Sequence, residues 1–182
     1  MIEMEMTLGL VVERRRSSHP WSVAAGQEFS WLPVQVLGEP PATASWTALD
    51  GNDELMRFYA GQVMLSVYST DTANYRDNLA SGLPKLWVAM LRSDGDPALD
   101  IVAISADPAE GEAWTEAGRY LVETLDMSDE IAAELARFIA DHHVERPIIK
   151  RKRDRAPPDV RWRAEPTVAE RAAVDDPGAG GS

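Results

Sequence analysis

The most restrictive pattern in the chain is an apolar stripe with helical spacing between residues 128 and 143. Five residues share one face of an α-helix at this spacing: Ile131, Leu135, Phe138, Ile139 and His142. Ser128 is a favourable N-cap, and Pro147 prevents the helix from continuing far. We therefore expect a helix from Ser128 to about His143 whose apolar face covers another layer of structure.

Most of the remaining chain consists of short apolar runs with strand-like alternation. Strands are expected near residues 4–12, 29–37, 44–49, 54–68, 83–93, 98–106 and 119–125. Pro33 indicates an edge strand or a bulge, because proline cannot donate to a neighbouring strand. Ala60-Gly61 predicts a tight hairpin inside 54–68, and the sequence DGDP predicts a hairpin turn between two later strands.

Two segments have the end signals of short helices. The first begins at Thr70 or Asp71 and ends near Gly82. The second has Asp107 as N-cap, Pro108 at the first helical position and an end near residue 118. Strands in mostly hairpin order, two short helices and one longer final helix are typical of the α+β class.

We therefore predict an α+β fold. Its centre is a curved, mostly antiparallel sheet or half-barrel of six to eight strands, with the C-terminal helix packed on one face. Residues 1–149 are expected to form a single domain. Residues 150–182 hold too few apolar residues to fold alone and are predicted to form a tail, basic at first and then acidic and glycine-rich.

Charge is distributed unevenly along the chain. Residues 145–163 hold eight Lys or Arg against three Asp or Glu, although the whole chain carries a net charge of −12. An acidic body repels nucleic acid and anionic membrane surfaces, so neither is an expected partner. The basic segment is either a solvated, solubilising tail or a docking peptide for an acidic partner protein.

The sequence lacks the residues and motifs that several kinds of chemistry require. The chain has no cysteine, which excludes disulfides, thiolate metal sites and cysteine nucleophiles. Neither a G-x-S-x-G nucleophile motif nor a glycine-rich phosphate loop is present. No apolar run approaches the roughly 20 residues of a membrane span, and the first residues lack the order of a secretory signal. We expect a cytoplasmic protein with no catalytic residues and no bound cofactor.

The adjacent histidines, His142 and His143, resemble a metal site at first sight. On a helix their side chains diverge by roughly 100°, whereas helical ligand pairs are three or four residues apart. His142 is expected against the core, and His143 on the surface near the last helical carbonyls. No metal site is predicted.

A few residues are candidates for binding a partner protein. Trp21 and Trp114 fall where partial exposure is expected, and exposed tryptophan is a frequent interface anchor. Charged candidates come from two basic clusters and from the helix end: Arg14, Arg15, His143, Lys150, Arg151, Lys152 and Arg153.

Five stretches of the chain together resemble one family: GLVVERRRSSHPW, WLPVQVLG, YRDNLASGLPKLWVAMLR, DPAEGEAWTEAG and FIADHHVERPIIKRKRDR. It is a family of uncharacterised bacterial proteins encoded beside genes of molybdenum-dependent formate dehydrogenase. Some members carry the label "molybdopterin-guanine dinucleotide biosynthesis protein A". The guanylyltransferase of that name resembles a Rossmann-like fold with a glycine-rich loop, but the first strand here leads into ERRRSSHPW, which has no glycine.

The resemblance implies a non-catalytic accessory protein. Its partner would be a formate dehydrogenase subunit, bound for assembly, maturation or regulation. Two alternatives remain open: an enzyme of molybdenum cofactor nucleotide metabolism, and a small-ligand-binding domain that uses the concave side of the sheet.

Overall fold

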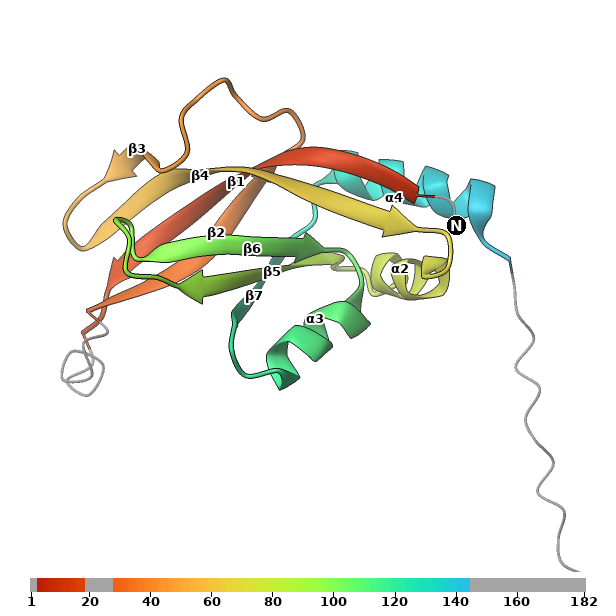
Figure 1. The fold of residues 1–182 in the computed structure, drawn as a ribbon. Coiled ribbons are helices and arrows are strands. Elements are labelled where there is room, and N and C mark those ends of the chain that lie inside the picture. The colour runs from red at the N-terminus through yellow and green to blue at the C-terminus, as the bar shows by residue number, and fades with distance from the viewer. Residues whose placement is uncertain (1–2, 19–27, 145–182) are drawn as a thin grey trace, which may run out of the picture. The chain divides into compact units, whose positions relative to one another are not determined.

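The computed structural model describes residues 3–18 and 28–144, which hold all the helices and strands named below (Figure 1). The predicted domain boundary at residue 149 and the predicted tail, residues 150–182, lie outside the described residues.

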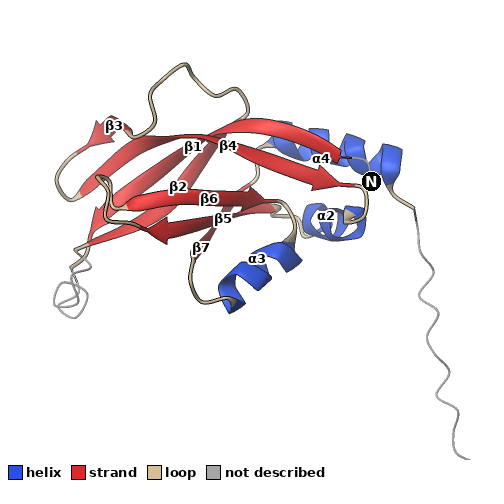
Figure 2. Ribbon diagram, in the orientation of Figure 1, coloured by secondary structure: helices blue, strands red, loops and turns tan. Residues whose placement is uncertain are grey.

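Seven strands form one sheet, and their arrangement confirms the predicted α+β fold (Figure 2). The strands are β1 (Glu3–Arg16), β2 (Phe29–Leu37), β3 (Thr47–Gly51), β4 (Leu55–Tyr68), β5 (Lys85–Arg92), β6 (Leu99–Ser105) and β7 (Leu121–Asp126). Their order is β2-β1-β4-β6-β5-β7, and β3 also pairs with β4. Only β4 and β6 run parallel. The outer strands β2 and β7 contact each other, so the mostly antiparallel sheet curves into a near-barrel.

Irregular pairing beside β1 helps to produce this curvature. The β1–β2 register shifts between Val11 and Val12, opposite Pro33 and Gln35. The β1–β4 register shifts one residue earlier along β1, opposite Tyr59 and Gly61. Bulges of this kind bend the strand and increase its twist. The expectation that Pro33 marks an edge strand or a bulge is confirmed on both counts.

The hairpin predicted at Ala60-Gly61 is wrong, because β4 is one strand of 14 residues that runs through both positions. Gly61 has a φ of 116°, and the chain bulges there instead of turning. A side chain at Gly61 would also overlap the Ser45 hydroxyl, which would have to move to make room. Turns and bulges both use glycine at positive φ, which explains the error.

Three helices occur in residues 3–18 and 28–144: α2 (Thr72–Ala80), α3 (Pro108–Glu116) and α4 (Asp129–His142). The Ser128 hydroxyl accepts a hydrogen bond from the Ile131 amide and caps α4, as predicted. The stripe on α4 is buried at Ile131, Leu135 and Phe138, and it packs into the core with buried residues of β1, β2, β4, β5, β6 and β7.

The two short helices are attached to the sheet by specific contacts. Asn78 of α2 is 5% exposed and makes three hydrogen bonds. Its amide donates to the carbonyls of Lys85 and Ala106, and its side-chain oxygen accepts from the Lys85 amide. Helix α3 approaches β5 so closely that Gly111 lies against the indole ring of Trp87.

Candidate partner-binding surface

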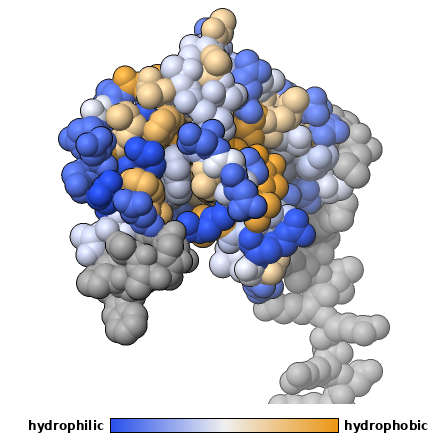
Figure 3. All heavy atoms as spheres, turned by 60° about the vertical axis from the view of Figure 1, so that its left-hand side comes forward, coloured by the Kyte–Doolittle hydropathy of each residue, from blue (hydrophilic) through white to orange (hydrophobic). Residues whose placement is uncertain are grey.

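Four arginines gather where β1 ends. Three of them, Arg14, Arg15 and Arg16, are consecutive on β1, and Arg57 lies on β4 opposite Glu13. Successive side chains of a strand point to opposite faces, so Arg14 and Arg16 lie on one face and Arg15 on the other. Figure 3 brings this end of the molecule forward, and strongly hydrophilic side chains cover much of it.

Arg14 is held by aromatic rings. Its guanidinium carbon lies 4.4 Å from the ring centre of Phe29 and 5.4 Å from that of Phe58. No carboxylate of residues 3–18 and 28–144 forms an ion pair with Arg14, although Arg15 and Arg16 each form one and Arg57 forms two. The N–H donors of a guanidinium lie in its own plane, and stacking on a ring does not occupy them. Arg14 can therefore present these donors to an incoming acceptor.

The rings beneath Arg14 are themselves fixed by the core. Trp31 is 8% exposed, as expected for a core residue. Its ring centre lies 5.8 Å from that of Phe58 and 5.9 Å from that of Trp46, with an edge-on angle of 76° between the two indoles. The aromatic cluster therefore limits the positions that the Arg14 guanidinium adopts.

Glu13 organises the arginines on the other face. It is 2% exposed, and its two carboxylate oxygens accept hydrogen bonds from Nε of Arg15 and from Nε of Arg57, the latter at 3.2 Å. The hydrogen bond from Arg15 lowers the pKa of Glu13 most strongly, burial opposes it, and the Arg57 hydrogen bond adds to the lowering. Glu13 is therefore a buried carboxylate that stays charged because two arginines bind it.

This arrangement predicts a pH-dependent contribution to stability. A carboxyl group whose pKa is lowered by folding stabilises the protein above its unfolded pKa, here about 4.5, and loses that contribution as the pH falls through the lowered value. The wild-type chain should therefore exceed Glu13→Gln in free energy of unfolding by a constant amount above pH 4.5, and by less in stronger acid. Chemical denaturation across the pH series measures this difference.

Glu134→Gln is the control for that series, because Glu134 forms an exposed ion pair with Arg137 on α4. Exposed pairs contribute little, so this variant should differ slightly from the wild type at every pH. A Glu13→Gln difference that stays constant into strong acid would contradict the role of the Glu13 charge.

The other predicted residues do not join this surface where the structure describes them. His143 caps the end of α4, and its ring nitrogens lie 3.0 Å from the Thr72 hydroxyl and 3.0 Å from an Arg76 nitrogen. Trp114 lies half-buried on α3. Trp21 and the predicted set Lys150, Arg151, Lys152 and Arg153 lie outside the described residues.

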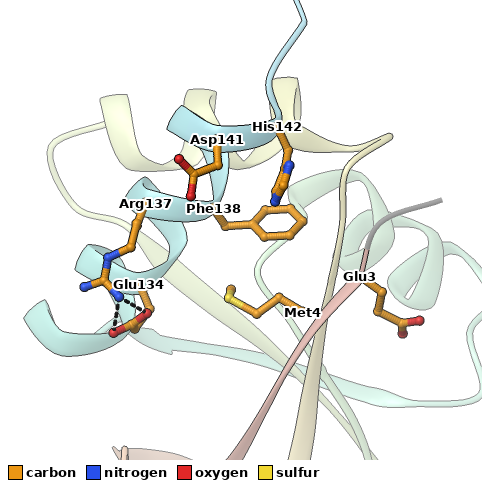
Figure 4. Close-up of a pocket in the computed structure, with 7 residues that line it drawn as sticks. All are labelled: Glu3, Met4, Glu134, Arg137, Phe138, Asp141 and His142. Carbon is orange, nitrogen blue, oxygen red and sulfur yellow. Dashed lines mark hydrogen bonds and ion pairs between the residues drawn. The ribbon is translucent and has the colours of Figure 1, made fainter.

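A second surface feature is an open groove of about 330 Å³ between α4 and the start of β1 (Figure 4). Its lining is Glu3, Met4, Glu134, Arg137, Phe138, Asp141 and His142. The His142 ring packs edge-on against Phe138 at 4.7 Å, which confirms that His142 closes the apolar face of the helix. Arg137 is bound to Glu134 by hydrogen bonds of 2.9 and 3.1 Å. The groove is consequently lined by charges that already neutralise one another in part.

Within the described part of the chain, no group of three or more His, Cys, Asp or Glu side chains is placed to hold a metal ion. No described helix has the length and apolar character needed to cross a membrane.

Sequence reasoning identified Arg14 and Arg15 as candidates but missed the residues that hold them. Phe29, Phe58 and Arg57 come from other strands, and their proximity to β1 depends on pairing that the sequence pattern does not specify. One signal was available: Glu13 occupies a position between apolar Val12 and three arginines inside a strand. An acid at a position of that kind is buried only when cations accompany it.

The protein is thus an α+β domain in which arginines are ordered at one end of a near-barrel sheet. The chain belongs to the family described as "Protein of unknown function (DUF3305)", whose match covers residues 7–153. The expectation of an uncharacterised family is thereby confirmed, and that description makes no statement about formate dehydrogenase. Searches among curated proteins and among solved structures each found no match.

Proposed function

We propose that this protein is a non-catalytic accessory protein that binds a cytoplasmic molybdenum enzyme, formate dehydrogenase in the first place, for its assembly, maturation or regulation. The choice of enzyme rests on the resemblance of the five sequence stretches. The observation that supports binding is the state of Arg14, which is stacked on two rings and has no acidic partner among the described residues.

Arginine is favoured at the centre of protein interfaces because its planar guanidinium stacks on aromatic rings and donates two parallel hydrogen bonds to one carboxylate. A free arginine side chain loses much rotamer freedom when a partner fixes it. The rings of Phe29 and Phe58 impose that restriction before binding, so a carboxylate of the partner meets donors already in position. The predicted basic set, residues 150–153, would supply a second contact with an acidic patch of the same partner.

The first test measures the affinity of the purified full-length chain for purified formate dehydrogenase, with the wild-type chain and Arg14→Gln compared. Loss of charge-assisted hydrogen bonds costs about 1.5–3 kcal/mol, so Kd should rise roughly tenfold or more. Arg14→Lys keeps the charge but not the fork of donors, and it should also weaken binding. Biolayer interferometry at fixed ionic strength measures all three.

Arg92→Gln is a matched control, because Arg92 is an exposed arginine at the end of another strand, β5. Its affinity should equal that of the wild type. The quadruple variant Lys150/Arg151/Lys152/Arg153→Ala tests the basic segment separately. If the wild-type chain does not bind formate dehydrogenase, the choice of that enzyme is overturned. If Arg14→Gln binds as tightly as the wild-type chain, the role of the arginine surface is overturned.

A further inference from the structure

Two arginines share one buried carboxylate on the face of the sheet opposite to Arg14. Glu13 and Arg57 are direct partners across the β1–β4 ladder, and Arg15 lies two residues further along β1 on the same face. The Glu13 side chain is 3% exposed, whereas the side chains of Arg15 and Arg57 are 52% and 48% exposed. The carboxylate is thus buried beneath two guanidinium groups that remain accessible to solvent.

Both arginines use the same nitrogen to reach Glu13. Arg15 donates from Nε to one carboxylate oxygen, and Arg57 donates from Nε to the other. A guanidinium has five N–H donors, so four donors on the Nη nitrogens of each arginine are not used by Glu13. Among the described acids, only Asp50 forms a further ion pair there, at 3.7 Å from Nη1 of Arg57, and its side chain is 66% exposed.

We propose that Arg15 and Arg57, positioned by Glu13, form a binding site for a phosphate-type oxoanion. The two guanidinium charges exceed the single charge of Glu13, which leaves the trio with one net positive charge. A phosphate has oxygens that point in several directions and can accept from two guanidinium groups at once, whereas a carboxylate offers only two oxygens in one plane. This site requires neither formate dehydrogenase nor the Arg14 surface.

The ligand source is either free phosphate or the terminal group of a phosphate monoester, because both offer the same oxygens. Asp50 competes for Arg57 from an exposed strand, and an incoming phosphate would displace it. Glu13 is a positioning residue in this site. Its carboxylate fixes Nε of both arginines and so directs their remaining donors to a common ligand.

The test is a titration of the ¹⁵N-labelled full-length chain, followed by NMR at constant ionic strength. The ligands are inorganic phosphate, O-phosphoserine and, as a planar anion, acetate. Phosphate or phosphoserine should bind more tightly than acetate and shift the Nε–Hε signals of Arg15 and Arg57. Arg15→Gln and Arg57→Gln should each weaken binding about tenfold or more, since each removes charge-assisted hydrogen bonds. A preference for one phosphate ligand over the other identifies the source.

Glu13→Gln separates positioning from simple charge attraction. This substitution adds one net positive charge, so attraction alone predicts tighter phosphate binding, whereas loss of positioning predicts weaker binding. We expect weaker binding. Asp50→Asn should tighten it, because the competing carboxylate is removed.

Thermal unfolding shows whether each variant is folded. If Glu13→Gln fails to fold, Arg15→Gln and Arg57→Gln still test the site, because they change only half-exposed side chains. Arg92→Gln, which changes an exposed arginine on β5, is the control and should bind phosphate as the wild type does. The proposal is overturned if acetate binds as tightly as phosphate, if Glu13→Gln binds phosphate more tightly, or if Arg92→Gln loses as much affinity as Arg57→Gln.

Discussion

Replacement of Asn78 by alanine should lower the free energy of unfolding by about 3 kcal/mol, because it leaves three backbone groups without their partner. The Asn78 side chain bonds the amide and carbonyl of Lys85 and the carbonyl of Ala106. These groups lie where α2 meets the start of β5 and the end of β6, and Asn78 is 5% exposed. Urea denaturation of the variant and the wild type measures the difference.

Two further variants define the cause of that loss. Asp77→Ala changes the exposed neighbour in the same helix and should stay within about 0.5 kcal/mol of the wild type. Asn78→Asp keeps the shape but replaces the donating amide with an oxygen, and it should be as damaging as Asn78→Ala because two carbonyls would then face a carboxylate. A stable Asn78→Asp chain would show that the donated hydrogen bonds contribute little.

Replacement of Gly111 by alanine should lower the free energy of unfolding by about 2 kcal/mol, the typical cost of overpacking. Alanine favours a helix over glycine by about 1 kcal/mol, so an exposed helix would gain from this change. At Gly111, however, the added methyl group overlaps the indole of Trp87. Helix α3 would have to move away from β5, and the loss of packing outweighs the gain in helix propensity.

Replacement of Trp87, the residue that Gly111 contacts, should remove the destabilisation caused by Gly111→Ala. In a Trp87→Leu background the indole is absent, and Gly111→Ala should then be neutral or stabilising through helix propensity. The four chains of this double-mutant cycle are compared by thermal and chemical denaturation. The same destabilisation in both backgrounds would mean that contact with Trp87 is not the reason for glycine at this position.

The helices were predictable because their signals are local. Ser128 and the apolar stripe specify α4, and Asp107 with Pro108 specifies the start of α3; the Asp107 side chain accepts a hydrogen bond from the Ala109 amide. The strands were also largely predictable from alternation. The mistake at Ala60-Gly61 has a non-local cause, because β1 lies alongside the whole of β4 and keeps it as one strand.

The candidate surface was predictable only in part for the same reason. The arginines of ERRR are visible in the sequence, but the ring under Arg14 and the second cation on Glu13 come from β2 and β4. Alternation predicts which β1 side chains share a face. It does not indicate which strand is adjacent to β1, so neither Phe29 nor Arg57 could be assigned to the surface in advance.

The pairing of β1 with β4 also has a consequence for the order in which the protein folds. Glu3 pairs with Tyr68 and Arg15 with Leu55, so the longest ladder joins segments far apart in the chain. Closing such long loops costs entropy before the contacts form, and sheets of this kind fold in milliseconds to seconds. During synthesis β1 and β2 emerge well before β4, so one edge of β1 has no pairing strand until β4 has been made. Until then this unpaired edge is a place at which the nascent chain can aggregate.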